Sequence, residues 1–168
     1  SHQLLNAARR IGVNLDMIET GRQINEKMPE HVIELTLDAF KEHNKSIQNN
    51  DILILGVSYK PDVKDIQLTP AKHIIEKLQK LGANVHIYDP YFSSSQIFGI
   101  NVEENLDSII SQVDATIIVT AHSEFKKITP SIFNQMKSPI LIDTRGIIDP
   151  VDAKRAKLIF RGLGRGKL

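Results

Sequence analysis

The sequence predicts an α/β protein in which a helical arm precedes one domain with a doubly wound parallel sheet. From residue 51 onwards, short apolar runs alternate with segments of helical periodicity, as in parallel strands joined by right-handed crossovers. The runs are apolar at consecutive positions, which is typical of strands buried on both faces. Residues 1–48 show helical periodicity alone. The length of 168 residues allows one such domain with an appendage.

The helical arm (residues 1–48) is expected to contain two helices. The first ends near Gly12, because glycine is a common C-terminal stop. Pro29 lies inside the second helix and predicts a kink or a break near Met28, since proline removes one helical hydrogen bond. Residues 41–50 are mostly polar and indicate a helix end and a linker. The second helix carries a one-sided apolar stripe of Met17, Gly21, Ile24, Met28, Val32, Leu35 and Ala39.

This stripe can pack back on its own domain or against the arm of another subunit. A helix pair attached through a polar linker has little local core to cover its apolar side, which favours a subunit or interdomain interface. We therefore expect a homodimer in which residues 17–39 are buried between two copies of the chain.

The α/β domain (residues 49–168) is expected to contain five strands. The apolar runs that predict them span 51–57, 84–89, 115–120, 139–143 and 157–160. An amphipathic helix is predicted over 70–81, with Thr69 as its N-cap and Gly82 as its stop. Shorter helices are predicted over 103–112 and 130–136.

Composition excludes several classes of function. Lys and Arg number 21 against 20 Asp and Glu, so the formal net charge of +1 gives no overall attraction to nucleic acid or to an anionic membrane. No apolar run approaches the roughly 20 residues of a membrane-spanning helix. The chain has no cysteine, which removes disulfides, thiolate zinc sites and a cysteine nucleophile, and the histidines show no metal-binding spacing. A soluble cytoplasmic protein without a metal is the expectation.

The loop after the first strand is the first candidate site, because ligands of open α/β sheets bind beyond the carboxyl ends of the strands. Gly56 stands alone there, so the loop is not a G-x-G-x-x-G phosphate-binding turn, and NAD binding by this domain is weakly supported. Tyr59 and Lys60 suit a flat, anionic ligand such as a nucleotide. The alternative, a surface lysine beside a half-buried tyrosine, is favoured by these residues alone.

The loop after the fourth strand places Asp143 and Arg145 at the same edge of the sheet. Arginine is suited to bidentate recognition of a carboxylate or phosphate. An equally weighted alternative is a local pairing of Arg145 with Asp143 or with Asp149 that only fixes the loop.

Two further polar residues lie at or just after the ends of predicted strands. Asp89 ends the second strand, where a ribose-binding acid would lie, but Pro90 makes a turn cap at least as plausible. His122 follows the third strand and could titrate near neutral pH. A lone histidine in this position more often stabilises a loop or caps a helix.

Together these elements resemble the C-terminal part of the UDP-glucose/GDP-mannose dehydrogenase family. The resemblance is carried by ILILGVSYKPDVKDIQLTPAKHIIEKLQKLGANVHIYDPYF (52–92), IIVTAHSEFKKI (117–128), LIDTRGIID (141–149) and FRGLGRG (160–166), in the family's order. The arm segment ETGRQINEKMPEHVIE (19–34) resembles the family's central dimerisation helices. Its I-N-x-x-M-P form is most similar to the branch that acts on UDP-N-acetylhexosamines such as UDP-N-acetylmannosamine.

The resemblance implies a nucleotide-sugar 6-dehydrogenase, which oxidises the C6 alcohol of the sugar to a carboxylate in two NAD-dependent steps through a thioester on a cysteine. It assigns residues 1–48 to part of the central dimerisation region and residues 49–168 to a Rossmann-like domain that binds the UDP-sugar. Tyr59, Lys60 and Arg145 would contact the substrate.

Loop support and cofactor contact are implied for three further residues. Asp65 and Asp143 would hold the binding loops, and Gln67 would lie on the cofactor side. The family usually has an arginine where Gln67 stands, so NAD would be bound mainly by an N-terminal domain that this sequence does not include. Lys64 and Asp65 replace a common acidic pair, which changes the charge of the loop.

The sequence has no cysteine and no G-x-G-x-x-G turn. Given the resemblance, these two absences predict a C-terminal fragment of such an enzyme that begins just after the catalytic segment and cannot oxidise a substrate alone. The first residue, Ser1, is consistent with a piece of a longer chain. Two alternatives remain open, namely a stand-alone nucleotide-binding or regulatory module and a structural oligomerisation fragment.

Overall fold

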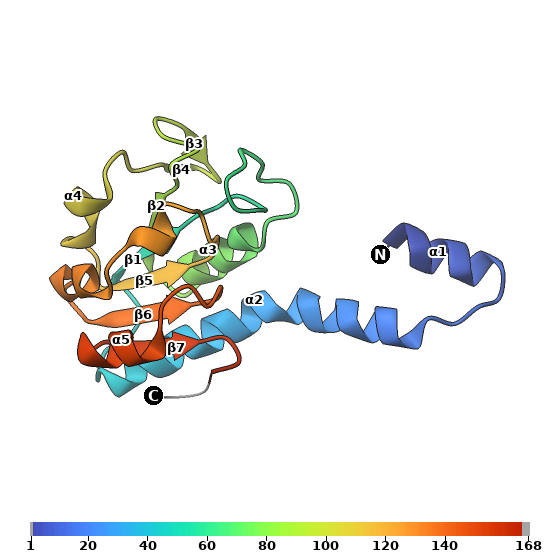
Figure 1. Cartoon of the computed structure of the whole chain (residues 1–168), viewed down its shortest axis with the longest axis horizontal. Helices are drawn as coiled ribbons and strands as arrows, with labels where there is room; N and C mark the ends of the chain where they lie inside the picture. The colour runs from blue at the N-terminus through green and yellow to red at the C-terminus, as the bar shows by residue number, and fades with distance from the viewer. Residues whose placement is uncertain (1, 166–168) are drawn as a thin grey trace.

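A single parallel sheet forms the centre of the α/β domain in the computed structural model, which describes residues 2–165 (Figure 1). Its strands lie in the order β2-β1-β5-β6-β7, and every neighbouring pair is parallel. The doubly wound α/β fold is thereby confirmed. The strands are β1 (Asp51–Leu55), β2 (Asn84–Tyr88), β5 (Ala115–Ile118), β6 (Ile140–Asp143) and β7 (Ile159–Gly162).

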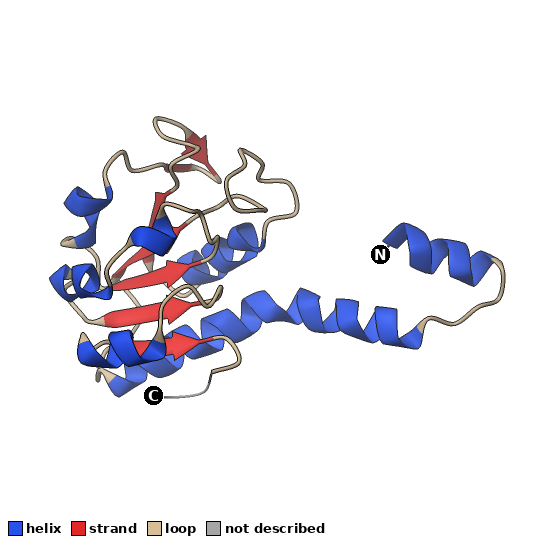
Figure 2. Ribbon diagram, viewed as in Figure 1, coloured by secondary structure: helices blue, strands red, loops and turns tan. Residues whose placement is uncertain are grey.

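Helices cover both faces of this sheet (Figure 2). The α-helices are α1 (His2–Arg10), α2 (Asp16–Glu42), α3 (Pro70–Lys80), α4 (Leu106–Ile110) and α5 (Pro150–Arg155). Two 3₁₀ helices, η1 (Phe125–Lys127) and η2 (Pro130–Gln135), and a small hairpin of β3 (Gln96–Ile97) and β4 (Ile100–Asn101) complete the described elements.

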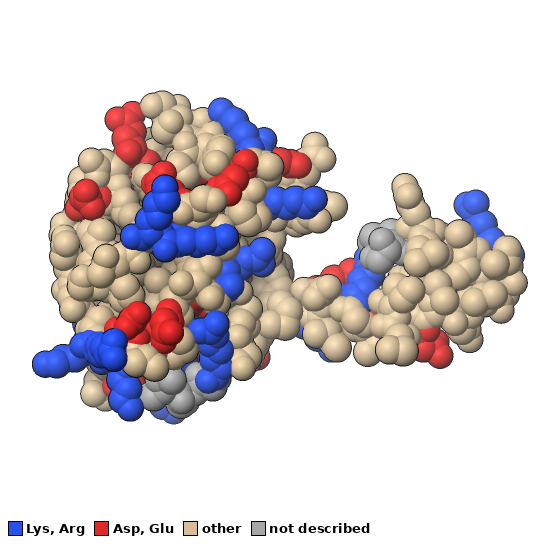
Figure 3. All heavy atoms as spheres, in the orientation of Figure 1, with Lys and Arg blue, Asp and Glu red and all other residues tan. Residues whose placement is uncertain are grey.

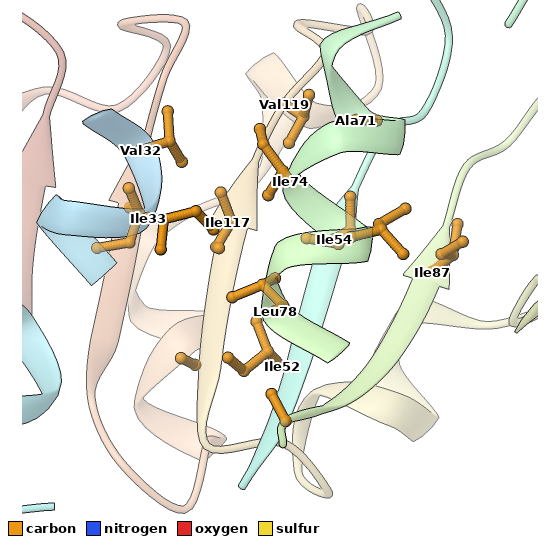
Figure 4. Close-up of a cluster of buried hydrophobic side chains, with 14 of the residues drawn as sticks. Val32, Ile33, Ile52, Ile54, Ala71, Ile74, Leu78, Ile87, Ile117 and Val119 are labelled. Atoms are coloured by element: carbon orange, nitrogen blue, oxygen red, sulfur yellow. The ribbon is translucent and has the colours of Figure 1, made fainter. Parts of the chain in front are cut away.

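The central strand β1 shows why its run of apolar residues is continuous. Ile52 and Ile54 pack with α2 and α3 in one core cluster, drawn in Figure 4, whereas Leu53 and Leu55 pack in a second cluster with α4, α5 and the 3₁₀ helices. All four side chains have no solvent exposure. Burying an aliphatic side chain of this size is worth about 1.5–3 kcal/mol, so both faces contribute to stability.

Helix α2 belongs partly to the arm and partly to the domain. Met17 and Ile24 are 90% and 55% exposed on the segment that extends away from the sheet, while Val32 and Ala39 are 3% and 0% exposed against the domain core (Figure 1). The two alternatives for the apolar stripe thus apply to different halves. The C-terminal half packs on its own domain, and only the N-terminal half is left for another partner.

Of the kink or break expected near Met28, the break is wrong, because α2 continues without interruption from Asp16 to Glu42 with Pro29 inside it. The residue that follows, Glu30, accepts a hydrogen bond from Lys77 (2.7 Å) and pairs with His73 (3.3 Å), both on α3. A proline inside a helix costs about 3 kcal/mol, which the burial of the following turns against the sheet can offset.

Buried Arg161 on β7 joins α2 to the sheet. Its side chain is 2% exposed, its Nε donates to Asp38 Oδ2 at 2.9 Å, and its Nη2 donates to Glu42, so both carboxylates come from α2. Burial lowers the pKa of the guanidinium, but Glu42 and Asp38 outweigh this and raise the pKa above its ordinary value. Arg161 therefore stays charged and holds α2 against β7, the edge strand of the sheet.

Some predicted elements differ from the observed ones. The helix expected over 103–112 is the single short helix α4, and the one expected over 130–136 is the 3₁₀ helix η2. The last strand begins at Ile159 rather than 157, because Lys157 adopts a left-handed turn conformation. None of the helices within residues 2–165 combines the length and hydropathy that a membrane span requires.

Candidate ligand-binding cleft

A cleft of about 690 Å³ opens at the carboxyl edge of the sheet. The loops after β1 and β6 contribute Tyr59 and Arg145, the N-terminal turn of α3 contributes Thr69, and α2 contributes Asn25 and Met28. Strand order reverses between β1 and β5, and an open α/β sheet binds ligands at such a point. The volume is within the range of small-molecule sites.

Tyr59 and Lys60 follow β1 in a turn whose backbone is tied down. The Tyr59 N–H donates to the carbonyl of Asp65 at 2.7 Å, and Tyr59 is 46% exposed at the cleft. The Lys60 Nζ lies 5.5 Å from the centre of the Tyr59 ring, a cation–π distance. Within residues 2–165 Lys60 forms no ion pair, so its ammonium can receive an anion.

Arg145 reaches the cleft because Asp143 shapes its loop. The buried Asp143 carboxylate accepts hydrogen bonds from the N–H groups of Arg145, Gly146 and Ile148, each at 2.8 Å. Asp149 instead caps α5 by accepting from Val151. The local side-chain pairing of Arg145 with either aspartate is therefore absent from the described residues, and the guanidinium is exposed at the cleft.

Gln67 is not among the residues that line the cleft. It is exposed, and its N–H donates to Asp65 Oδ1 at 2.8 Å. Together with the Tyr59 contact, this bond makes Asp65 a support of the loop. The structure thus brings Tyr59 and Arg145 to one cleft, with Lys60 beside the Tyr59 ring, and leaves Gln67 outside.

Asp89 is a buried support of the neighbouring turns. It has no solvent exposure and accepts hydrogen bonds from Val57 N–H (2.8 Å), Tyr91 N–H (2.9 Å) and the His122 ring (3.1 Å). Burial raises the pKa of this carboxyl, but the bonds from His122, Val57 and Tyr91 outweigh it and hold the pKa below its ordinary value. Of the two sequence interpretations, the turn-capping one agrees with this geometry.

Charges of both signs are mixed over the face of the molecule shown in Figure 3, as the near-zero net charge predicts. An anionic ligand would therefore be held by individual cations and not by a broad basic surface. No group of His, Asp and Glu side chains in the described residues has the arrangement of a metal site.

A doubly wound sheet with an aromatic and an arginine at its carboxyl-edge cleft defines an α/β domain suited to bind a nucleotide. Residues 53–150 match the UDP-glucose/GDP-mannose dehydrogenase family, UDP binding domain. The chain belongs to this family.

Individual relatives agree with this assignment. The UDP-glucose 6-dehydrogenase TuaD of Bacillus subtilis is 31% identical over 96% of this chain and 35% of its own length. The UDP-N-acetyl-D-mannosamine dehydrogenase of Pyrococcus horikoshii is 33% identical over 89% of this chain and 34% of its own. A solved structure of UDP-D-ManNAc dehydrogenase from the same organism gives a TM-score of 0.81 at 31% identity, covering 96% of this chain and 36% of that one. The chain thus spans about a third of the length of these relatives.

Proposed function

We propose that the chain is the UDP-sugar-binding part of an NAD-dependent nucleotide-sugar 6-dehydrogenase that oxidises UDP-N-acetylmannosamine or a related UDP-hexosamine. The observation that carries the proposal is the cleft that Tyr59 and Arg145 both line, in a chain that matches a UDP-binding domain family. Relatives that match nearly the whole chain bear the names of UDP-sugar dehydrogenases, which supports the substrate class.

The chemistry of the cleft fits a nucleoside diphosphate. The Tyr59 ring offers a flat apolar surface for a base or sugar. The Arg145 guanidinium can bind a phosphate in a bidentate manner, and the Lys60 ammonium adds a second positive charge. The N-terminus of α3 also lies at the cleft, and the positive end of a helix dipole favours an anion.

The residues after β1 do not fit NAD. A dinucleotide turn requires glycines that let the backbone approach a pyrophosphate. The space above Gly56 is instead filled by Thr120, whose Cβ would lie only 2.5 Å from a Cβ placed on Gly56. We therefore propose that NAD is held mainly by a domain outside these 168 residues. A contact from Gln67 to the cofactor remains a prediction.

Arg145→Ala is expected to weaken UDP binding by about tenfold to a hundredfold, because it removes a charge-assisted, bidentate hydrogen bond. Isothermal titration calorimetry with UDP measures this change. Arg155→Ala is the matched control, since Arg155 is exposed on α5 and pairs only with Asp152 among the described residues. Equal affinities of the Arg145 variant and the control would contradict the assignment of the cleft.

Residues 1–168 alone are expected to produce no NADH from NAD and UDP-N-acetylmannosamine. They contain no cysteine for the covalent step that the family resemblance implies. Absorbance at the NADH wavelength measures the reaction, and robust turnover would show that these residues hold a complete active site.

We further propose that the exposed N-terminal half of α2 forms a homodimer. Ile24→Asp is expected to shift the chain from dimer to monomer in analytical ultracentrifugation, since it places a charge in an apolar interface. Val151→Asp on α5 is the matched control, because Val151 is 58% exposed and Ile24 is 55% exposed. A wild-type chain that stays monomeric at high concentration, with no effect of Ile24→Asp, would count against the dimer.

A further inference from the structure

A buried histidine–aspartate pair lies directly beneath the loop that carries Tyr59 and Lys60. His122 follows β5 and Asp89 directly follows β2, and both side chains have no solvent exposure. The His122 Nε2 lies 3.1 Å from Asp89 Oδ2. The ring is also packed against Tyr91 and Phe125, with centroid distances of 4.9 and 5.3 Å, which fixes its orientation.

The hydrogen bonds determine which ring nitrogen carries the proton. The Asp62 N–H donates to His122 Nδ1 at 2.9 Å, so Nδ1 must be an unprotonated acceptor. The proton of the neutral ring is then on Nε2, from which it is donated to the Asp89 carboxylate. His122 thus accepts one hydrogen bond from the loop after β1 and donates one to Asp89, the residue that follows β2.

His122 and Asp89 hold the loop on both sides of Tyr59 and Lys60. Before them, Asp89 Oδ2 accepts from Val57 N–H at 2.8 Å and from Ser58 N–H at 3.2 Å. After them, Asp62 is held by His122. The His122–Asp89 pair therefore fixes the backbone both before and after the two exposed residues, Tyr59 and Lys60.

Asp62 reinforces this arrangement from the loop side. Its carboxylate accepts from Ser123 Oγ at 2.6 Å and from Ser123 N–H at 2.8 Å, and its backbone has a φ of 60°. A left-handed conformation at a residue other than glycine persists only where the surroundings stabilise it. The bond to His122 is one of the contacts that do so.

We propose that His122 is a positioning residue that orders the Tyr59–Lys60 loop for an anionic nucleotide in the cleft. The proposal rests on the proposed function for its ligand, but not for the ordering of the loop. A preformed loop loses less conformational freedom on binding, so ordering raises affinity without a direct contact.

Two variants separate the two hydrogen bonds of the ring. His122→Asn can place an amide oxygen near the position of Nδ1 and keep the acceptor for Asp62, whereas His122→Gln can place an amide N–H near Nε2 and keep the donor to Asp89. The glutamine variant is expected to speed amide hydrogen exchange at Asp62 and to weaken UDP binding, each by about fivefold, for one lost hydrogen bond. The asparagine variant is expected to retain more of the exchange protection at Asp62 and more of the UDP affinity than the glutamine variant.

His86→Gln is the matched control, because the His86 ring pairs with two carboxylates, Glu103 and Asp51, and among the described residues it forms no hydrogen bond to the loop after β1. Unchanged exchange at Asp62 in a folded His122→Gln chain would overturn the proposal. Absence of UDP binding in the wild type would contradict the proposed function, while exchange at Asp62 would still decide whether His122 orders the loop.

The wild-type chain supplies a test that needs no variant. Nitrogen-15 spectra of the imidazole are expected to show His122 as the neutral tautomer with its proton on Nε2. A proton on Nδ1 would remove the acceptor for Asp62 and would overturn the proposal.

Discussion

Gly56→Ala is expected to lower the free energy of unfolding by about 3–5 kcal/mol, which is a large part of the stability of a domain this size. A Cβ at this position would lie 2.5 Å from Thr120 Cβ and 3.1 Å from Thr120 Cα, and the φ of Gly56 is +84°. The clash is with a neighbouring strand end that cannot move freely, because Thr120 Oγ1 donates to the Ser58 carbonyl at 2.7 Å. Urea unfolding followed by circular dichroism measures the change.

Gly99→Ala separates the two causes. Gly99 has a similar φ of +80°, but a Cβ there would meet no atom within 4 Å. Its substitution is expected to cost only the left-handed backbone strain, about 1–2 kcal/mol. Equal decreases in the free energy of unfolding of the two variants would show that backbone strain, and not the contact with Thr120, accounts for the effect of Gly56→Ala.

The double variant Asp38→Asn and Glu42→Gln is expected to cost about 3 kcal/mol, because it leaves the charge of Arg161 buried without a charged partner. The loss of stability should be greatest where α2 packs on β7. Hydrogen exchange of the α2 amides after Pro29 should therefore become faster. Urea unfolding measures the stability, and exchange locates the change.

Glu76→Gln is the control for this pair. Glu76 lies 3.9 Å from Lys72 on the surface of α3, and both side chains are more than half exposed. An exposed pair of this kind contributes about 0–1 kcal/mol. A cost of the double variant no larger than that of the control would show that Arg161 does not hold α2 in place.

Much of the fold could be predicted because its signals are local. The continuous apolar run that becomes β1 indicates a strand buried on both faces, and Thr69 ahead of a proline indicates a helix start, which its bond to Ala71 N–H confirms. The break expected near Met28 does not occur, because the stability of α2 comes from its packing on the sheet, which sequence periodicity does not reveal. The hairpin of β3 and β4 was missed because its strands have only two residues each.

The candidate site was predictable from the topology of the sheet. Tyr59 and Arg145 are far apart in sequence but follow strands of one parallel sheet, so the rule that ligands bind at the carboxyl edge places them together. The role of His122 was not predictable. Its two partners, Asp62 and Asp89, lie 60 and 33 residues away, and no spacing in the sequence indicates that they meet.

The position of the ligand is the central claim, and amide chemical-shift mapping with UDP tests it most directly. Titration of the labelled chain is expected to shift the amides of residues 56–60, 119–122 and 144–146, which surround the carboxyl edge of β1, β5 and β6. Residues at the opposite edge, such as Asn84 at the start of β2, should not move. Shifts confined to that opposite edge, or to α1, would contradict the proposed site.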